Sequence, residues 1–108
     1  MTRLLISFIL LFVIGNCDVT NAQTKNMKTQ TGYANVNGIK MYYEIHGEGK
    51  PLVLIHGGGS TIQTTFGKVL PLLAGKYKVI AVELQAHGHT SDRNAPETFQ
   101  QDADDVAV

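Results

Sequence analysis

The stretch Leu52 to Thr61, LVLIHGGGST, joins a short apolar run to a histidine, three glycines and two hydroxyl residues. A backbone this bare after a buried strand could cradle a phosphate, act as a flexible linker, or turn peptide N–H groups toward a reacting oxygen. Because Gly57 to Gly59 have no β-carbon, a substrate could approach their N–H groups closely. Acyl transfer needs such donors, since its transition state places negative charge on a former carbonyl oxygen.

Residue spacing excludes two nucleotide-binding motifs at these glycines. A P-loop ends in Gly-Lys-Ser/Thr, but here Gly67 and Lys68 are followed by Val69. A dinucleotide fingerprint counted from Gly57 would need its third glycine where Ile62 stands. The glycines therefore fit either an oxyanion-binding loop or a tight strand-to-helix turn without a ligand, and spacing alone does not separate the two.

A second polar loop, ELQAHGHTSD, holds His87 and His89. These two histidines nearly spell the His-x-His-x-Asp-His pattern of zinc hydrolases, in which histidines and an aspartate bind the metal. The pattern misses by register, because Asp92 stands where the last histidine should be and Ser91 where the aspartate should be. We therefore expect a pair of loop histidines and no metal site.

The segment before these loops predicts an antiparallel hairpin. The dipeptide at Asn37 and Gly38 is the strongest two-residue hairpin signal, and it separates two short extended runs. After the turn, apolar residues recur at every second position, while polar ones ending in His46 occupy the other face. That alternation predicts a half-buried strand with His46 facing solvent.

Two later apolar runs, Leu52 to Ile55 and Tyr77 to Leu84, lack alternation and predict parallel strands that are covered on both faces. The segment between them repeats apolar residues at helical spacing and ends at Gly75. This helical face consists of Ile62, Phe66, Val69, Leu70 and Leu73. Pro71 lies inside the pattern, so we expect it to kink or shorten the helix. Strand, helix and strand together predict a right-handed βαβ crossover.

A further amphipathic helix is predicted near the end of the sequence. Asn94 could cap this helix and Pro96 suits its first turn. Its apolar face would hold Phe99, Ala103 and Val106. Because the pattern reaches Val108 without a stop signal, we expect the helix to continue in a longer protein of which these 108 residues are the front part.

The order of these elements, with HGGGS after the first buried strand and ELQAHGHTSD after the second, resembles the N-terminal part of the α/β-hydrolase fold family. The resemblance covers residues 32–108. It implies an α/β fold class, with a β-hairpin, then βαβ with parallel strands, then the start of a further helix. In that family the HGGG loop supplies one oxyanion N–H, which the resemblance assigns to Gly58 in preference to Gly59.

The resemblance also implies structural roles for the other motif residues. These are His56, Gly57, Ser60, Glu83, His87 and Gly88. The second motif departs from the family's usual acid-x-Arg-Gly-His-Gly-x-Ser, because Gln85 and Ala86 replace the arginine and the first glycine, and this leaves the subfamily open. No GxSxG turn occurs in the 108 residues, so the family pattern implies a serine nucleophile beyond Val108, followed by an acid and a histidine base.

The first 22 residues predict a secretory signal peptide. Arg3 gives a positive start, LLISFILLFVI forms the apolar centre, and small residues up to Ala22 suit cleavage. A bacterial lipoprotein acylated at Cys17 is the alternative, but Asn16 is unusual before the acylated cysteine. We expect a mature N-terminus at Gln23 and a polar tether over residues 23–31, with the folded domain occupying residues 32–108.

The charge composition limits the classes of molecule that the protein is expected to bind. Nine basic and nine acidic residues give a net charge of zero, without a cluster dense enough to follow a nucleic-acid backbone. The sequence therefore predicts an exported hydrolase that acts on a small-molecule ester, amide or related acyl bond, needs no cofactor, and is inactive as these 108 residues alone. The alternatives are a non-catalytic binding protein that has this fold and, further off, a zinc-dependent hydrolase using His87 and His89.

Overall fold

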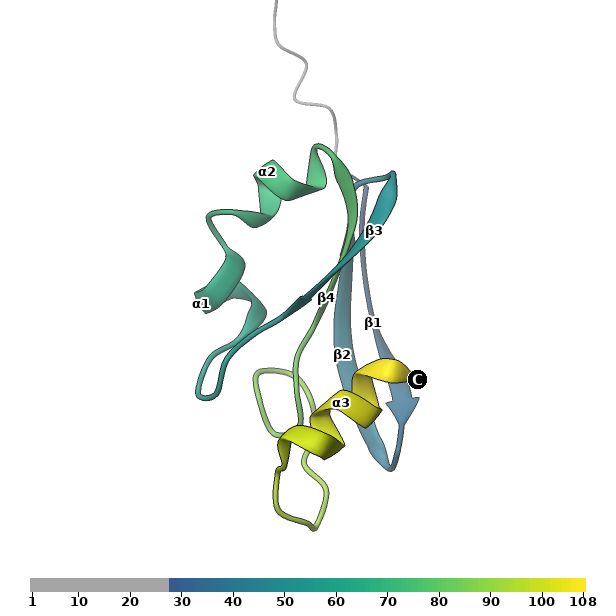
Figure 1. Cartoon of the computed structure of the whole chain (residues 1–108), viewed down its shortest axis with the longest axis vertical. Coiled ribbons are helices and arrows are strands. Elements are labelled where there is room, and N and C mark those ends of the chain that lie inside the picture. Colours follow the sequence, from purple (N-terminus) through teal and green to yellow (C-terminus); the bar gives the residue numbers. More distant parts are fainter. Residues whose placement is uncertain (1–27) are drawn as a thin grey trace, which may run out of the picture.

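A computed structural model describes residues 28–108 (Figure 1). The predicted signal peptide with Cys17 and the first part of the predicted tether, residues 23–27, lie outside the described residues. Within the described part, no helix is both long and apolar enough to span a bilayer.

Four strands form one mixed sheet in the order β1-β2-β4-β3. They are β1 (Thr29–Val36), β2 (Ile39–His46), β3 (Lys50–Ile55) and β4 (Tyr77–Val82). The first two pairs, β1 with β2 and β2 with β4, are antiparallel, and β3 with β4 is parallel. The parallel pair brings the C-terminal ends of β3 and β4 to the same edge, so the two motif loops that follow them meet there.

The predicted hairpin is confirmed. Val36 pairs with Ile39, and the two residues between them, Asn37 and Gly38, have φ angles of 43° and 84°. Positive φ at both central positions is the signature of the type I′ turn, whose twist matches that of the flanking strands. Strand β1 begins at Thr29, so the tether predicted over residues 23–31 ends earlier than expected, because Thr29 to Thr31 pair with the end of β2.

The predicted single helix between β3 and β4 is two short helices, α1 (Ile62–Phe66) and α2 (Leu70–Ala74). The break lies at residues 67–69, and Pro71 stands in the first turn of α2, where its missing N–H removes no helical hydrogen bond. Val69 is therefore not part of a continuous apolar face and is 40% exposed. Helix α1 starts at a capping box in which Thr61 and Thr64 bond each other's backbone.

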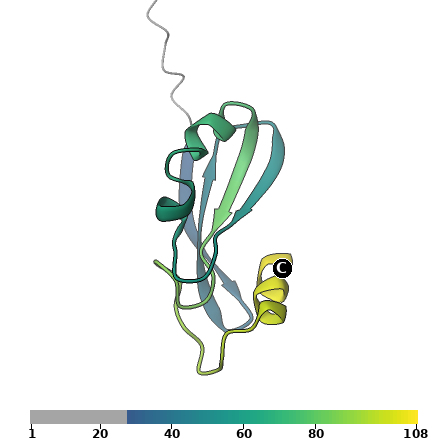
Figure 2. The ribbon, with the colours of Figure 1, turned by 60° about the vertical axis from the view of Figure 1, so that its left-hand side comes forward.

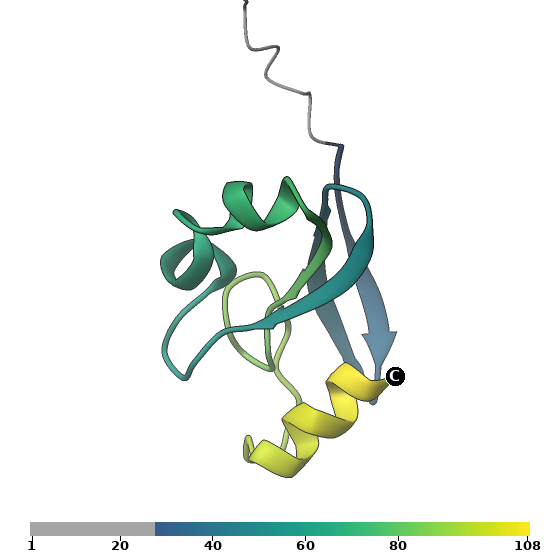
Figure 3. The same ribbon diagram turned by 45° about the horizontal axis from the view of Figure 1, so that its top comes forward.

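The two faces of the sheet are covered by different helices (Figures 1 and 2). Helices α1 and α2 pack on one face around a cluster of buried residues. This cluster contains Ile62, Leu70, Ala74, Val79 and Ala81. On the opposite face, Val106 of α3 (Phe99–Ala107) packs against a second cluster of Val36, Ile39, Met41 and Val82. Figure 3 shows α3 near the hairpin end of that face.

The prediction that both parallel strands are covered on both faces is wrong for β3 in the described residues. Val53 and Ile55 are 47% and 49% exposed. The reason is that α1 and α2 cover only the face to which Leu54 points, while α3 reaches the second cluster and not the middle of β3. In contrast, β4 lies between β2 and β3, and its Val79 and Ala81 are fully buried.

The start of the last helix was also predicted wrongly. Thr98, and not Asn94, caps α3, because the Thr98 hydroxyl accepts a hydrogen bond from the N–H of Gln101. Phe99, expected on the buried face, is 95% exposed. The buried residue of α3 is Asp105, which no apolar periodicity could indicate.

His46 does not face solvent as predicted. Its side chain is only 15% exposed and pairs through Nε2 with the Glu44 carboxylate at 2.7 Å. The polar face of β2 is the face that α1 and α2 cover, and Tyr42 on that face packs against the Ile62 cluster. Tyr42 also donates to Glu44 at 3.0 Å, so the polar side chains of this strand are bonded to one another under the edge of the helical layer.

Candidate active site

The HGGGS segment follows β3 directly and turns into α1. His56 is buried, with 4% of its surface exposed, and its Nε2 accepts the N–H of Leu84 at 3.0 Å. Its Nδ1 lies 2.8 Å from the carbonyl oxygen of Gly57, and the Ser60 hydroxyl donates to the same oxygen at 2.7 Å. His56 thus joins the end of β4 to the first glycine of the loop.

The three glycine N–H groups are in different situations. Gly59 donates to Nε2 of His87 at 3.0 Å. The N–H groups of Gly57 and Gly58 donate to no acceptor within the described residues, and both glycines are exposed. A donor aimed at substrate must be free of internal partners, so the structure favours Gly58 over Gly59 as an oxyanion donor.

The described residues do not need glycine at positions 57 and 58 for packing. An added β-carbon at either residue would meet nothing within 4 Å. Only Gly59, with a φ of 72°, has a backbone conformation that disfavours other residues. The open space beside Gly57 and Gly58 would allow a ligand or another part of the protein to approach their backbone closely.

Glu83, predicted to be structural, lies under this loop. Its carboxylate accepts the N–H of Ile62 at 3.1 Å and the N–H of His89 at 2.8 Å, and it pairs with Nδ1 of His89 at 2.9 Å. Burial alone would raise the pKa of this carboxyl, but the hydrogen bonds from His89 and Ile62 outweigh burial, so the pKa lies below its ordinary value. An ionised Glu83 therefore connects the start of α1 to the second motif loop.

His87 and Gly88 complete the contact between the loops. The His87 Nδ1 lies 2.8 Å from the carbonyl oxygen of Gln85, while its Nε2 accepts a hydrogen bond from the N–H of Gly59. Gly88 has a φ of 53° and lies against the Glu83 carboxylate with no room for a side chain. The predicted motif residues from two distant segments are thus brought together at the end of the parallel strands.

Two acidic residues near His87 were not predicted to belong to the site. Glu97 lies 3.7 Å from Nδ1 of His87, and Asp102 of α3 has a buried Oδ1 without a hydrogen-bond partner in the part of the chain that the structure describes. Burial and the neighbouring Glu97 raise the pKa of the Asp102 carboxyl. The sequence carried no signal for them, because only the fold of the 85–98 loop brings α3 toward the glycines.

A cavity of about 290 Å³ adjoins Gly58. Its lining residues come from the end of β3, the glycine loop, the segments after β4 and before α3, and α3 itself. They are Ile55, His56, Gly57, Gly58, Leu84, Glu97, Phe99, Asp102, Ala103 and Val106. Apolar walls around a few polar groups are typical of small-molecule sites.

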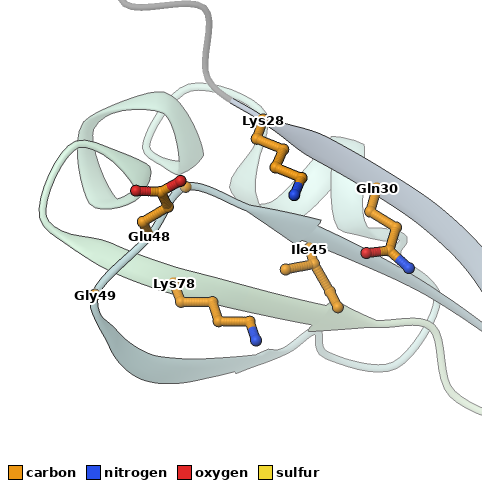
Figure 4. A pocket seen from close by; sticks show the side chains of 7 residues that line it. Lys28, Gln30, Ile45, Glu48, Gly49 and Lys78 are labelled. Carbon is orange, nitrogen blue, oxygen red and sulfur yellow. The ribbon is translucent and has the colours of Figure 1, made fainter.

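A second cavity, of about 230 Å³, lies where β2 leads into β3, at the end of the sheet away from the glycine loop (Figure 4). Lys28, Glu48 and Lys78 contribute its charged groups, and no histidine or hydroxyl side chain lines it. It lies away from both motif loops, so we place the candidate active site at the glycine loop.

A buried polar network, also unpredicted, fixes the loop that carries His87. Arg93 bonds both carboxylate oxygens of Asp105 at 2.9 and 3.0 Å and the side-chain oxygen of Gln85 at 2.5 Å. Gln85 in turn donates to Asp92 at 2.8 Å. Gln85, one of the departures from the family motif, thus has a defined partner in Arg93.

The described residues contain no group of three or more histidine, cysteine, aspartate or glutamate side chains that could bind a metal ion. Both ring nitrogens of His87 are in hydrogen-bond contact with backbone atoms, and Nδ1 of His89 contacts Glu83. The zinc alternative therefore has no support from the described geometry.

No protein-family model matches the chain. Over 79 residues it is 32% identical to 2-hydroxy-6-oxo-6-(2'-aminophenyl)hexa-2,4-dienoic acid hydrolase of Metapseudomonas resinovorans, an alignment that covers 68% of this chain and 27% of that protein. The fold is similar to a serine hydrolase involved in carbazole degradation, with a TM-score of 0.67, 28% identity, and coverage of 74% of this chain and 32% of the other. An epoxide hydrolase matches with a TM-score of 0.68, 31% identity, and coverage of 74% and 28%. The chain therefore spans about a third or less of each of these relatives.

Proposed function

Because this chain forms the N-terminal part of an α/β-hydrolase fold, we propose that the full-length protein hydrolyses an ester, amide or related acyl bond of a small molecule. The three relatives named above are hydrolases by name, and those names include a dienoic acid and an epoxide as substrates. The reaction type, hydrolysis, is common to these relatives and supports the proposal, whereas their named substrates differ.

One observation carries the proposal: the N–H of Gly58 is exposed and has no acceptor among the described residues, in a loop that is bonded on both sides of it. The carbonyl of Gly57 and the N–H of Gly59 are both engaged by histidine rings. A rigid loop with a free N–H costs no reorganisation when charge develops on a substrate oxygen. Gly58 is accordingly the proposed first donor of an oxyanion hole.

The proposed nucleophile is a serine in a GxSxG turn, which the 108 residues do not contain. The rest of α3, a short loop and an apolar strand would put this serine roughly 20–35 residues beyond Val108, with an Asp or Glu and then a His later in the chain. Reading the continuing gene tests this part directly. An aspartate at the turn would indicate epoxide- or dehalogenase-type chemistry, and a glycine or alanine with no later histidine would indicate a binding protein.

A matched pair of variants in the full-length protein tests the role of Gly58. Gly58→Pro removes the N–H, and we expect kcat to fall by about 10²–10³ while KM changes less. Gly58→Ala keeps the N–H and has room for its β-carbon among the described residues, so it should lose much less activity. Circular dichroism and melting temperature must stay near wild type for both. Equal turnover in wild type and Gly58→Pro would refute the oxyanion role.

We also propose that the protein is exported, with residues 1–22 removed as a signal peptide and Gln23 as the mature N-terminus. The apolar centre and the small residues before Gln23 support this. Intact-mass measurement of exported protein distinguishes it from the lipoprotein alternative, in which the mass would correspond to a chain starting at an acylated Cys17.

A further inference from the structure

The glycine loop is held on both sides of Gly58 by histidine rings. On one side, Nδ1 of His56 lies 2.8 Å from the Gly57 carbonyl oxygen. On the other, Nε2 of His87 lies 3.0 Å from the Gly59 nitrogen. The two rings are themselves neighbours, with centroids 4.9 Å apart.

The partners of each ring determine which nitrogen carries hydrogen. For both histidines Nδ1 faces a carbonyl oxygen, which only accepts, so Nδ1 carries the hydrogen and donates it. For both, Nε2 faces a backbone N–H, that of Leu84 or of Gly59, so Nε2 must be the bare acceptor. Each ring is therefore neutral, because a protonated ring would turn a second N–H toward a backbone donor.

We propose that His56 and His87 are positioning residues that form a paired-histidine clamp, which holds the loop on both sides of Gly58 and leaves the Gly58 N–H available to a substrate oxygen. The clamp bonds the Gly57 carbonyl and the Gly59 N–H, and the N–H of Gly58 between them has no acceptor among the described residues, as an oxyanion donor requires. The effect of the clamp on catalysis rests on the proposed function. The existence of the clamp can be tested independently of that function, because its hydrogen bonds can be measured without a substrate.

Acidic side chains lie beside one of the two rings. Glu97 lies 3.7 Å from Nδ1 of His87, and Asp102 of α3 lies beside Glu97. His56 is buried and forms no ion pair with any described residue. The two rings of the clamp therefore lie in different electrostatic surroundings.

The first experiment measures the Gly59 to His87 hydrogen bond by NMR in the ¹⁵N-labelled full-length protein. An N–H···N bond transmits a nitrogen–nitrogen coupling, which we expect between the Gly59 amide and Nε2 of His87 at about pH 8, above the ordinary histidine range. Replacing His87 by Gln should abolish this coupling, and replacing His46 by Gln should leave it unchanged. Absence of the coupling at about pH 8 would overturn the clamp.

The second experiment uses turnover. His87→Leu removes the acceptor, and we expect kcat to fall by about 10–10²-fold with little change in KM, because the loop is no longer held. His87→Gln supplies an oxygen that can accept the Gly59 N–H, so it should recover turnover relative to His87→Leu. Turnover that is the same in wild type and His87→Leu overturns the catalytic role. If the full-length protein hydrolyses no acyl substrate, the proposed function fails, and the coupling still decides whether the clamp exists.

Discussion

The Glu83 carboxylate occupies the space that a side chain at position 88 would need, and Gly88 leaves that space open. Glu83 is buried, with 2% of its surface exposed, and bonds the first residue of α1 and the backbone of His89. Glycine at position 88 therefore allows the buried Glu83 carboxylate to bond both the backbone at the start of α1 and the second motif loop.

Gly88→Ala should destabilise the full-length protein by about 2–4 kcal/mol. The left-handed backbone costs a β-carbon about 1–2 kcal/mol, and the overlap with Glu83 adds a further amount of similar size. Gly38→Ala is the control, because Gly38 has a φ of 84° but open space around its β-carbon position, so its loss should be limited to about 1–2 kcal/mol. Urea unfolding measures both. Equal losses would mean that Gly88 matters for its backbone conformation alone.

The contribution of Glu83 to stability should depend on pH. Its folded pKa lies below its ordinary value, because hydrogen bonds from His89 and Ile62 outweigh burial. The stabilisation is therefore present above the ordinary pKa of an unfolded glutamate and is lost as pH falls through the lower folded pKa. We expect wild type to exceed Glu83→Gln in unfolding free energy at neutral pH, and the gap to narrow in strong acid. A gap that is constant with pH would contradict an ionised Glu83.

The buried pair of Arg93 and Asp105 should be costly to break. The Asp105 side chain is fully buried, and although burial would raise its pKa, bonds from Asn37, Gln101 and Arg93 lower it below the ordinary value. Arg93→Met leaves this carboxylate without its cation and should cost about 3–5 kcal/mol in unfolding free energy. Adding Asp105→Asn should recover part of the loss, and a double-mutant cycle measures the coupling. Simple additivity of the two losses would show that the pair does not interact.

Ala86→Gly should stabilise the protein. Ala86 has a φ of 59°, in the region that favours glycine, and it stands where the family motif has glycine. Removing its β-carbon relieves about 1–2 kcal/mol of strain against about 0.5–1 kcal/mol of added unfolded-state entropy, so a net gain of about 0.5–1 kcal/mol is expected. Ala95→Gly, at an exposed residue without positive φ, should instead lose stability. A loss in both variants would rule out strain at Ala86.

Elements whose signal is local were predicted well. The Asn37 and Gly38 turn needs only two residues with positive φ, and the strand from Ile39 alternates along its own length. The break between α1 and α2 was only partly foreseen. Pro71 indicated a disturbance, but its place in the first turn of α2 depends on how Leu70 packs against the sheet. The cap at Thr98 was missed because Asn94 has an equally good capping side chain, and only the path of the loop decides between them.

The sequence by itself determined the hairpin, the order of strands and helices, and the two motif loops, because turn chemistry and apolar periodicity act between neighbouring residues. The tertiary structure decided which of those residues meet. Gly59 and His87 are 28 positions apart, as are His56 and Leu84, and they come into contact because parallel pairing puts the ends of β3 and β4 at one edge. The neutral state of the two rings, the free N–H of Gly58 and the burial of Asp105 follow from those long-range contacts, which no local pattern specifies.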